Sequence, residues 1–260
     1  MIEELIIKLK ESVTCKQDAW KKDVYNSQHY QEELKLSRDI TSDFIHTLNS
    51  ISLYSTRAGK IYDDFLTIKA IDDILQSVIA ILSLVENGIH NTIKRELRYL
   101  IEMMTKYVIV DYVKMGEKLT IKTQYLKDFI PNSSIDIIDQ YTPPLSVEKN
   151  DEFKTEVKDF FYKACAYVHP SKKQIDGQVK NYERGNTIGF ESSKMLADMN
   201  KLIFRAYDMI LVMLFHGFGD SMSGDLFIQL LDDNKKWKFH KSKYVKEYSK
   251  NFDYKHERKT

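Results

Sequence analysis

His169 carries the side chain best suited to acid–base chemistry in the middle of this chain. It follows an apolar, aromatic run and precedes Pro170, and an imidazole titrates near neutral pH, so it can act as a general acid or base. Lys172 and Lys173 follow at once and suit a substrate that bears phosphate, while Tyr167 adds a hydroxyl group. The other interpretation is structural, because a histidine in the last turn of a helix stabilises the final carbonyl groups and a proline then ends the helix.

A polar stripe on a long predicted helix is the second candidate. Its members recur at steps of four, three, four and four residues and therefore share one helix face: Asn87, Asn91, Lys94, Arg98 and Glu102. One interpretation is a solvated face with a weak Arg98–Glu102 ion pair, worth about 0.2–0.5 kcal/mol. The other is a cleft in which Glu102 orients the Arg98 guanidinium toward a phosphate or carboxylate, with Arg95 and Lys94 beside it.

Long helices are expected to position these side chains. Only nine glycines and four prolines occur in 260 residues, which favours long helices over many short strands. Apolar residues at helical spacing occupy residues 71–85 and 89–108, and Asn87-Gly88 between them predicts the turn of a helical hairpin. A single continuous helix is the alternative. Residues 191–218 predict another strong helix, so we expect an all-α, multi-helix bundle with long antiparallel helices.

The charge of the chain is uneven. Residues 235–260 contain ten Lys or Arg and three acidic residues, a net +7, so the other 234 residues carry −6 of the overall +1. We therefore divide the chain into a helical bundle domain, residues 1–234, and a basic, aromatic C-terminal extension, residues 235–260. Its lysines are interleaved with aromatic residues, a combination that suits single-stranded nucleic acid. A C-terminal helix that packs its aromatic side chains on the bundle is the alternative.

Several classes of protein are excluded by what the chain lacks. Cys15 and Cys165 are the only cysteines and have no metal-like spacing, which argues against a disulfide scaffold and a zinc site. Phosphate-loop, dinucleotide-binding and His-Glu-x-x-His motifs are absent, so we expect no cofactor and no metal. The N-terminal MIEELIIKLKES predicts an amphipathic helix rather than a signal peptide. The most apolar run, residues 74–85, is too short to span a bilayer, so we expect a cytoplasmic protein without a membrane partner.

Two stretches resemble bacterial helical proteins of the HEPN-like kind, the higher-eukaryote and prokaryote nucleotide-binding superfamily. They are ENGIHNTIKRELRYLIEMMTKYV (Glu86–Val108) and YVHPS (Tyr167–Ser171). The resemblance implies an all-α bundle that binds RNA or cleaves it without a metal, often in toxin–antitoxin or antiphage systems. The superfamily's nuclease signature, Arg-x4–6-His on one helix, is absent. The same chemistry would therefore need a pair from two helices, Arg98 or Arg95 with His169.

Two hypotheses about function follow. The first is a HEPN-like protein that binds or cleaves RNA in antiphage defence or a toxin–antitoxin system. As an enzyme it would be a metal-independent endoribonuclease, with His169 as general base on a ribose 2′-hydroxyl, Arg98 stabilising the phosphorane charge and Glu102 orienting Arg98. The expected substrate-binding residues are Arg95, Lys94, Lys172, Lys173 and Tyr167. The second hypothesis is a non-enzymatic helical module that binds a protein partner. RNA, a second copy in a homodimer and a protein partner are thus the expected partners.

Overall fold

The computed structural model describes residues 2–57, 59–131, 134–168, 171–172, 175–176, 179, 192–228, 230 and 234–252, and these contain helices and no strand. The prediction of an all-α fold is therefore confirmed for this part of the chain. The principal helices are α1 (Ile2–Trp20), α2 (Gln28–Arg57), α3 (Leu66–Lys69), α4 (Ile71–Glu86), α5 (His90–Val113), α6 (Leu119–Phe129), α7 (Val147–Cys165), α9 (Ser193–Phe218), α10 (Asp220–Phe227) and α11 (Lys243–Tyr248). Shorter helical turns are the π-helix η1 (Lys21–Tyr25) and the 3₁₀ turns η2 (Gly59–Asp64), η3 (Asp136–Gln140), η5 (Lys238–Lys241) and η6 (Ser249–Asn251).

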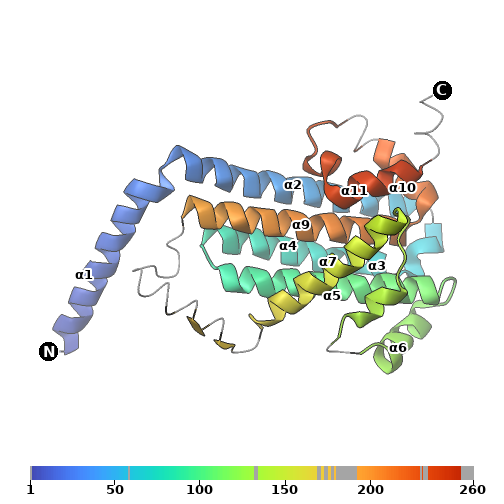
Figure 1. Ribbon diagram of the computed structural model, residues 1–260, viewed down its shortest axis with the longest axis horizontal. Coiled ribbons are helices and arrows are strands. Elements are labelled where there is room, and N and C mark those ends of the chain that lie inside the picture. Colours follow the sequence, from blue (N-terminus) through green and yellow to red (C-terminus); the bar gives the residue numbers. More distant parts are fainter. Residues whose placement is uncertain are drawn as a thin grey trace.

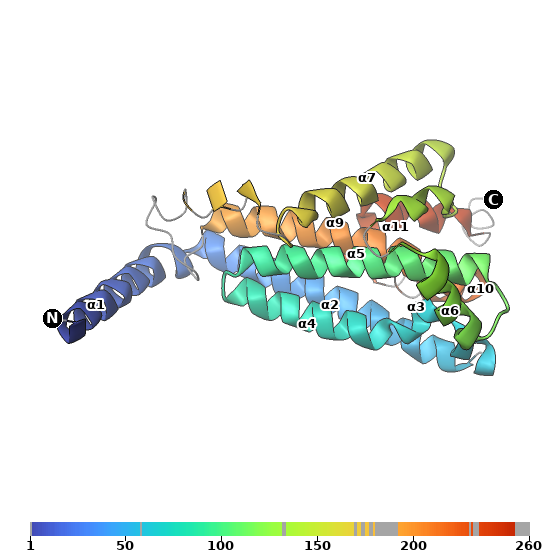
Figure 2. The same cartoon turned by 90° about the horizontal axis from the view of Figure 1, so that it is seen from below.

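Four long helices, α2, α4, α5 and α9, form the bundle (Figures 1 and 2). Helix α7 crosses α5 and α9 on one side, and α6 lies near the end of the bundle that holds the C-terminal half of α5. Helix α1 extends away from the bundle at the opposite end. No described helix combines the length and the apolar character that crossing a membrane requires.

The predicted helical hairpin is confirmed. Helices α4 and α5 pack against each other and are joined by a short turn that contains Gly88. The φ angle of Gly88 is +66°, in the left-handed region that glycine occupies without steric cost, so the chain can reverse at this point. The alternative of one continuous helix is wrong, because the backbone leaves the helical path at Asn87.

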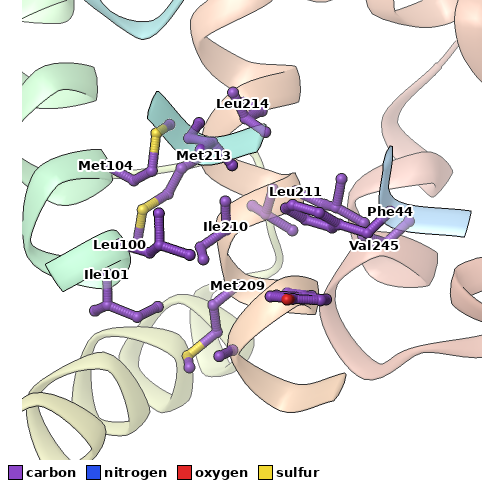
Figure 3. Packing of buried hydrophobic residues seen from close by; sticks show 14 of the residues in the cluster. Phe44, Leu100, Ile101, Met104, Met209, Ile210, Leu211, Met213, Leu214 and Val245 are labelled. Carbon is purple, nitrogen blue, oxygen red and sulfur yellow. The ribbon is translucent and has the colours of Figure 1, made fainter. Parts of the chain in front are cut away.

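Helix α9 is the centre of the hydrophobic core. From Ala206 to Phe215 every residue is buried, on all sides of the helix, as expected of a helix that is surrounded by others. Its neighbours include α2, α3, α5, α7, α10 and α11. Figure 3 shows this packing, with Leu100 and Met104 from α5, Phe44 from α2 and Val245 from α11 around the residues of α9. Such a helix fixes the relative positions of α5 and α7, on which the site described below depends.

The C-terminal residues up to Phe252 pack on the bundle. Their buried aromatic side chains belong to the same hydrophobic cluster as the long helices: Trp237, Phe239, Tyr244, Tyr248 and Phe252. The Trp237 indole N–H donates to Thr47 Oγ1 at 3.1 Å. The Asp208 carboxylate of α9 accepts hydrogen bonds from the backbone N–H groups of Tyr244 and Val245, at 2.9 and 3.0 Å. The packed alternative is therefore confirmed for these residues, and their rings are not exposed for stacking on bases.

Candidate functional site

The polar stripe of α5 faces α7. The side chains of Arg98 and Glu102 are only 18% and 17% exposed, because α7 packs across this part of α5. The interpretation of the stripe as a solvated face is therefore wrong at these two residues. The other interpretation, a cleft in which Arg98 faces a phosphate or carboxylate, stays a prediction; side chains of α7 contact the Arg98 guanidinium in this structure.

Arg98 makes three contacts that fix its orientation. Its Nη2 atom lies 3.3 Å from Glu102 Oε2, and its Nε–H donates to Cys165 Sγ at 3.3 Å. The centre of the guanidinium lies over the Phe161 ring, 4.4 Å from its centroid, which is a cation–π contact. Glu102 also accepts a hydrogen bond from Lys106 Nζ at 2.6 Å. The sequence correctly paired Arg98 with Glu102, but the contacts with Phe161 and Cys165 depend on the fold.

The first turns of α5 contact the segment just after α7. Lys94 Nζ lies 4.0 Å above the Tyr167 ring, and the Arg95 Nε–H donates to the Tyr167 carbonyl oxygen. The two stretches that the sequence analysis placed in one site therefore do meet in space. Lys172 is exposed. His169 and Lys173 lie outside the described residues, so their part in this site stays a prediction.

A surface pocket of about 200 Å³ lies beside these contacts. Residues from three helices and from the segment after α7 line it: Lys94 of α5; Glu156, Asp159, Phe160, Lys163 and Ala164 of α7; Tyr167; and Leu202 and Arg205 of α9. The sequence analysis missed the polar residues that α7 and α9 contribute. Glu156, Asp159 and Lys163 are spaced three and four apart and so share a helix face, but that spacing could not show that α9 would complete the pocket.

The charges at the pocket are partly paired. Arg205 Nη2 lies 2.6 Å from Glu156 Oε1, and Lys163 Nζ lies 2.9 Å from Asp159 Oδ2. Burial alone raises the pKa of Glu156, but its hydrogen bonds with Lys243, Tyr244 and Arg205 outweigh burial and hold that pKa below its usual value. Glu156 is therefore an ionised residue that ties α7 to α9 and α11, and it is poorly suited to act as a proton donor.

Positive charge prevails around this site. The pocket and the adjoining face of α5 hold six cationic side chains (Lys94, Arg95, Arg98, Lys106, Lys163 and Arg205) and three carboxylates (Glu102, Glu156 and Asp159), a net +3. Lysine and arginine side chains in this arrangement suit anionic groups such as phosphates. Among the residues that the structure describes, no group of three or more His, Cys, Asp or Glu side chains is placed to hold a metal ion.

Comparisons with known proteins identify no relative: no family model, no curated protein and no solved structure matches this chain.

Proposed function

We propose that this protein binds RNA where α7 meets α5 and α9. The observation that carries the proposal is the arrangement of Lys94, Lys163 and Arg205 from three different helices around one pocket. Arg95 donates to the carbonyl oxygen of Tyr167, which also lines the pocket. Phosphate contacts from lysine and arginine supply most of the affinity of proteins for nucleic acids. The resemblance of Glu86–Val108 and Tyr167–Ser171 to HEPN-like proteins supports the same ligand.

Bases have an aromatic surface available at the same place. The Tyr167 ring is partly exposed, lines the pocket and already carries the Lys94 ammonium on one face. A ring next to a cation is a common arrangement for single-stranded nucleic acid, since bases stack on the ring while the cation holds a phosphate. We therefore favour single-stranded RNA over a duplex.

The binding hypothesis is tested by neutralising the cations at the pocket. Fluorescence anisotropy with labelled single-stranded RNA and with tRNA, over a series of salt concentrations, compares the wild type with the triple variant Lys94→Gln/Arg95→Gln/Lys163→Gln. Each phosphate contact on a single strand contributes about 0.7 to the slope of log K against log salt, so loss of three contacts lowers the slope by about 2.

The matched control removes three charges elsewhere. Lys35→Gln/Lys118→Gln/Lys127→Gln changes exposed lysines on α2, next to α6 and on α6, and we expect it to keep the wild-type slope. Equal losses in the two triple variants would mean that binding is non-specific. No binding by the wild type at low salt would refute the proposal.

Cleavage requires a separate measurement. If the protein is a ribonuclease, total RNA incubated in the presence of a chelator is cleaved by the wild type, and both His169→Ala and Arg98→Ala abolish cleavage while binding persists. Because Arg98 is packed on Phe161 and Cys165, its variant is first checked for an unchanged melting temperature. RNA that is bound and left intact would assign the site to recognition alone.

The alternative function is a helical module that recruits a protein partner. One observation favours it, namely that the apolar side chains of α1 are exposed. A protein that neither binds nor cleaves RNA, and that forms a stable complex with a different protein through α1, would support this alternative.

A further inference from the structure

Helix α1 exposes its apolar side chains. None of its residues from Ile2 to Trp20 is buried, and the helix extends away from the bundle (Figures 1 and 2). Ile2 is 76% exposed, Leu9 57% and Val13 45%. Apolar side chains gathered on an exposed helix mark an interaction surface.

The spacing of these side chains fits a helix–helix seam. Ile2, Ile6, Leu9 and Val13 follow one another at steps of four, three and four residues, which is the alternation of a heptad repeat. Two helices with this pattern bury their seams against each other, each side chain fitting between side chains of the opposite helix. The seam of α1 therefore has the form that a second helix of the same kind would cover.

The flanking charges select an antiparallel arrangement of two copies. When Ile2 lies opposite Val13 of the second copy and Ile6 opposite its Leu9, the residues beside the seam bring Glu3 next to Lys10 of the second copy. By symmetry this contact forms twice. A parallel, in-register pair would instead place Lys16 of both copies against each other in the seam and would leave Glu3 and Lys10 without an opposite charge beside them.

The position of α1 leaves room for this pairing. The four apolar layers use residues 2–13 only, and Val13 is seven residues from Trp20, where α1 ends, a separation of ~10 Å along the helix. The two bundles would then lie at opposite ends of the paired helices, clear of each other. The surface is also poorly suited to an anionic membrane, since α1 has three lysines against four acidic residues, a net −1, whereas helices that lie on membranes are rich in Lys and Arg.

We propose that a second copy of this chain covers α1 through an antiparallel pairing of residues 2–13. This inference is independent of the proposed RNA site, because no residue of α1 lines the pocket.

Sedimentation equilibrium of the 260-residue chain tests the proposal. We expect a reversible dimer, twice the monomer mass of 30.6 kDa, that dissociates on dilution. The double variant Ile6→Asp/Leu9→Asp is expected to be monomeric with an unchanged melting temperature, because both side chains are exposed in the single chain. Ile7→Asp is the matched control: Ile7 is also exposed but lies outside the seam, so this variant should still dimerise.

Charge reversal tests the orientation. Glu3→Lys and Lys10→Glu are each expected to weaken the dimer at least tenfold, and the combined variant should restore it, because opposite charges again face each other.

Several results would overturn the proposal. A wild type that is monomeric at every concentration would do so, whether or not α1 then binds lipid vesicles or another protein. A dimer that survives Ile6→Asp/Leu9→Asp would place the interface elsewhere. Failure of the combined charge reversal to restore dimerisation would refute the antiparallel pairing.

Discussion

The buried ion pair between Asp111 and Lys122 offers the sharpest test of the packing. Lys122 Nζ lies 2.9 Å from Asp111 Oδ1, and the two side chains are 0% and 3% exposed. The Asp111 carboxylate also accepts hydrogen bonds from the backbone N–H groups of Leu66 and Thr67, at 3.0 and 2.8 Å, and from the Thr67 hydroxyl at 2.9 Å. Asp111 of α5 is therefore bonded both to the start of α3 and to α6. The Lys122 ammonium contacts this carboxylate and the face of the Phe65 ring.

This asymmetry predicts unequal costs for removing the two partners. Asp111→Ala leaves the Lys122 ammonium buried without its counter-charge, which costs about 3–5 kcal/mol of the free energy of unfolding. Lys122→Met fills the same space with an apolar chain and leaves Asp111 three hydrogen-bond donors, so we expect about half that loss. Once Asp111 is absent, Lys122→Met should raise stability, because it removes a charge that has lost its partner.

Urea unfolding followed by circular dichroism measures these changes. Asp128→Ala, an exposed acid on α6, is the control and should change the free energy of unfolding by less than about 0.5 kcal/mol. A further loss of stability when Lys122→Met is added to Asp111→Ala would refute the reasoning. It would mean that the ammonium reaches water or another partner once the carboxylate is gone.

Three further predictions follow from individual contacts. Because the pKa of Glu156 is below its ordinary value of 4.5, its ionised form stabilises the fold above pH 4.5. Glu156→Gln should therefore lower the free energy of unfolding at pH 7. In urea unfolding, the difference in this free energy between the variant and the wild type should shrink as the pH falls below 4.5. Gly217→Ala would place a methyl group 2.8 Å from Thr67 Oγ1. This overpacking costs about 1–3 kcal/mol, whereas alanine gains about 1 kcal/mol over glycine in helix propensity. We therefore expect a lower melting temperature. Trp237→Ala should cost about 3–5 kcal/mol, whereas an unchanged melting temperature would mean that this segment is not part of the core.

The periodicity of apolar residues was sufficient for the long helices and for the turn at Gly88. It was insufficient for the C-terminal segment. Tyr244, Tyr248 and Phe252 recur at steps of four, and this spacing fits exposed side chains that stack on bases as well as a buried helix face. The choice between the two depends on whether a neighbouring helix holds the segment so that its rings are buried. Here Asp208 of α9 holds the segment in place, since its carboxylate accepts the N–H groups at the start of α11.

A sequence signal for such anchors does exist. Asp111 and Asp208 each stand alone within strongly apolar helical segments, Val108–Val113 and Tyr207–Leu211. A lone acid there must be buried together with hydrogen-bond donors, because an unpaired buried charge is too costly. The sequence thus indicates that these acids have partners, but it cannot identify Lys122 or Ser242 as those partners, since both come from segments brought in by tertiary packing.

The candidate site shows the same division between local and tertiary information. Spacing on one helix was enough to pair Arg98 with Glu102, since i and i+4 side chains meet in any α-helix. The consequence of that pairing depends on α7, which covers the guanidinium with Phe161 and Cys165. A packed arginine of this kind holds α7 at a fixed distance from α5, whereas Lys94 and Arg205 line the pocket itself. Arg98 thus supports the helices that form the pocket. A direct role for Arg98 in phosphoryl chemistry requires that a ligand displace its contacts with Phe161 and Cys165.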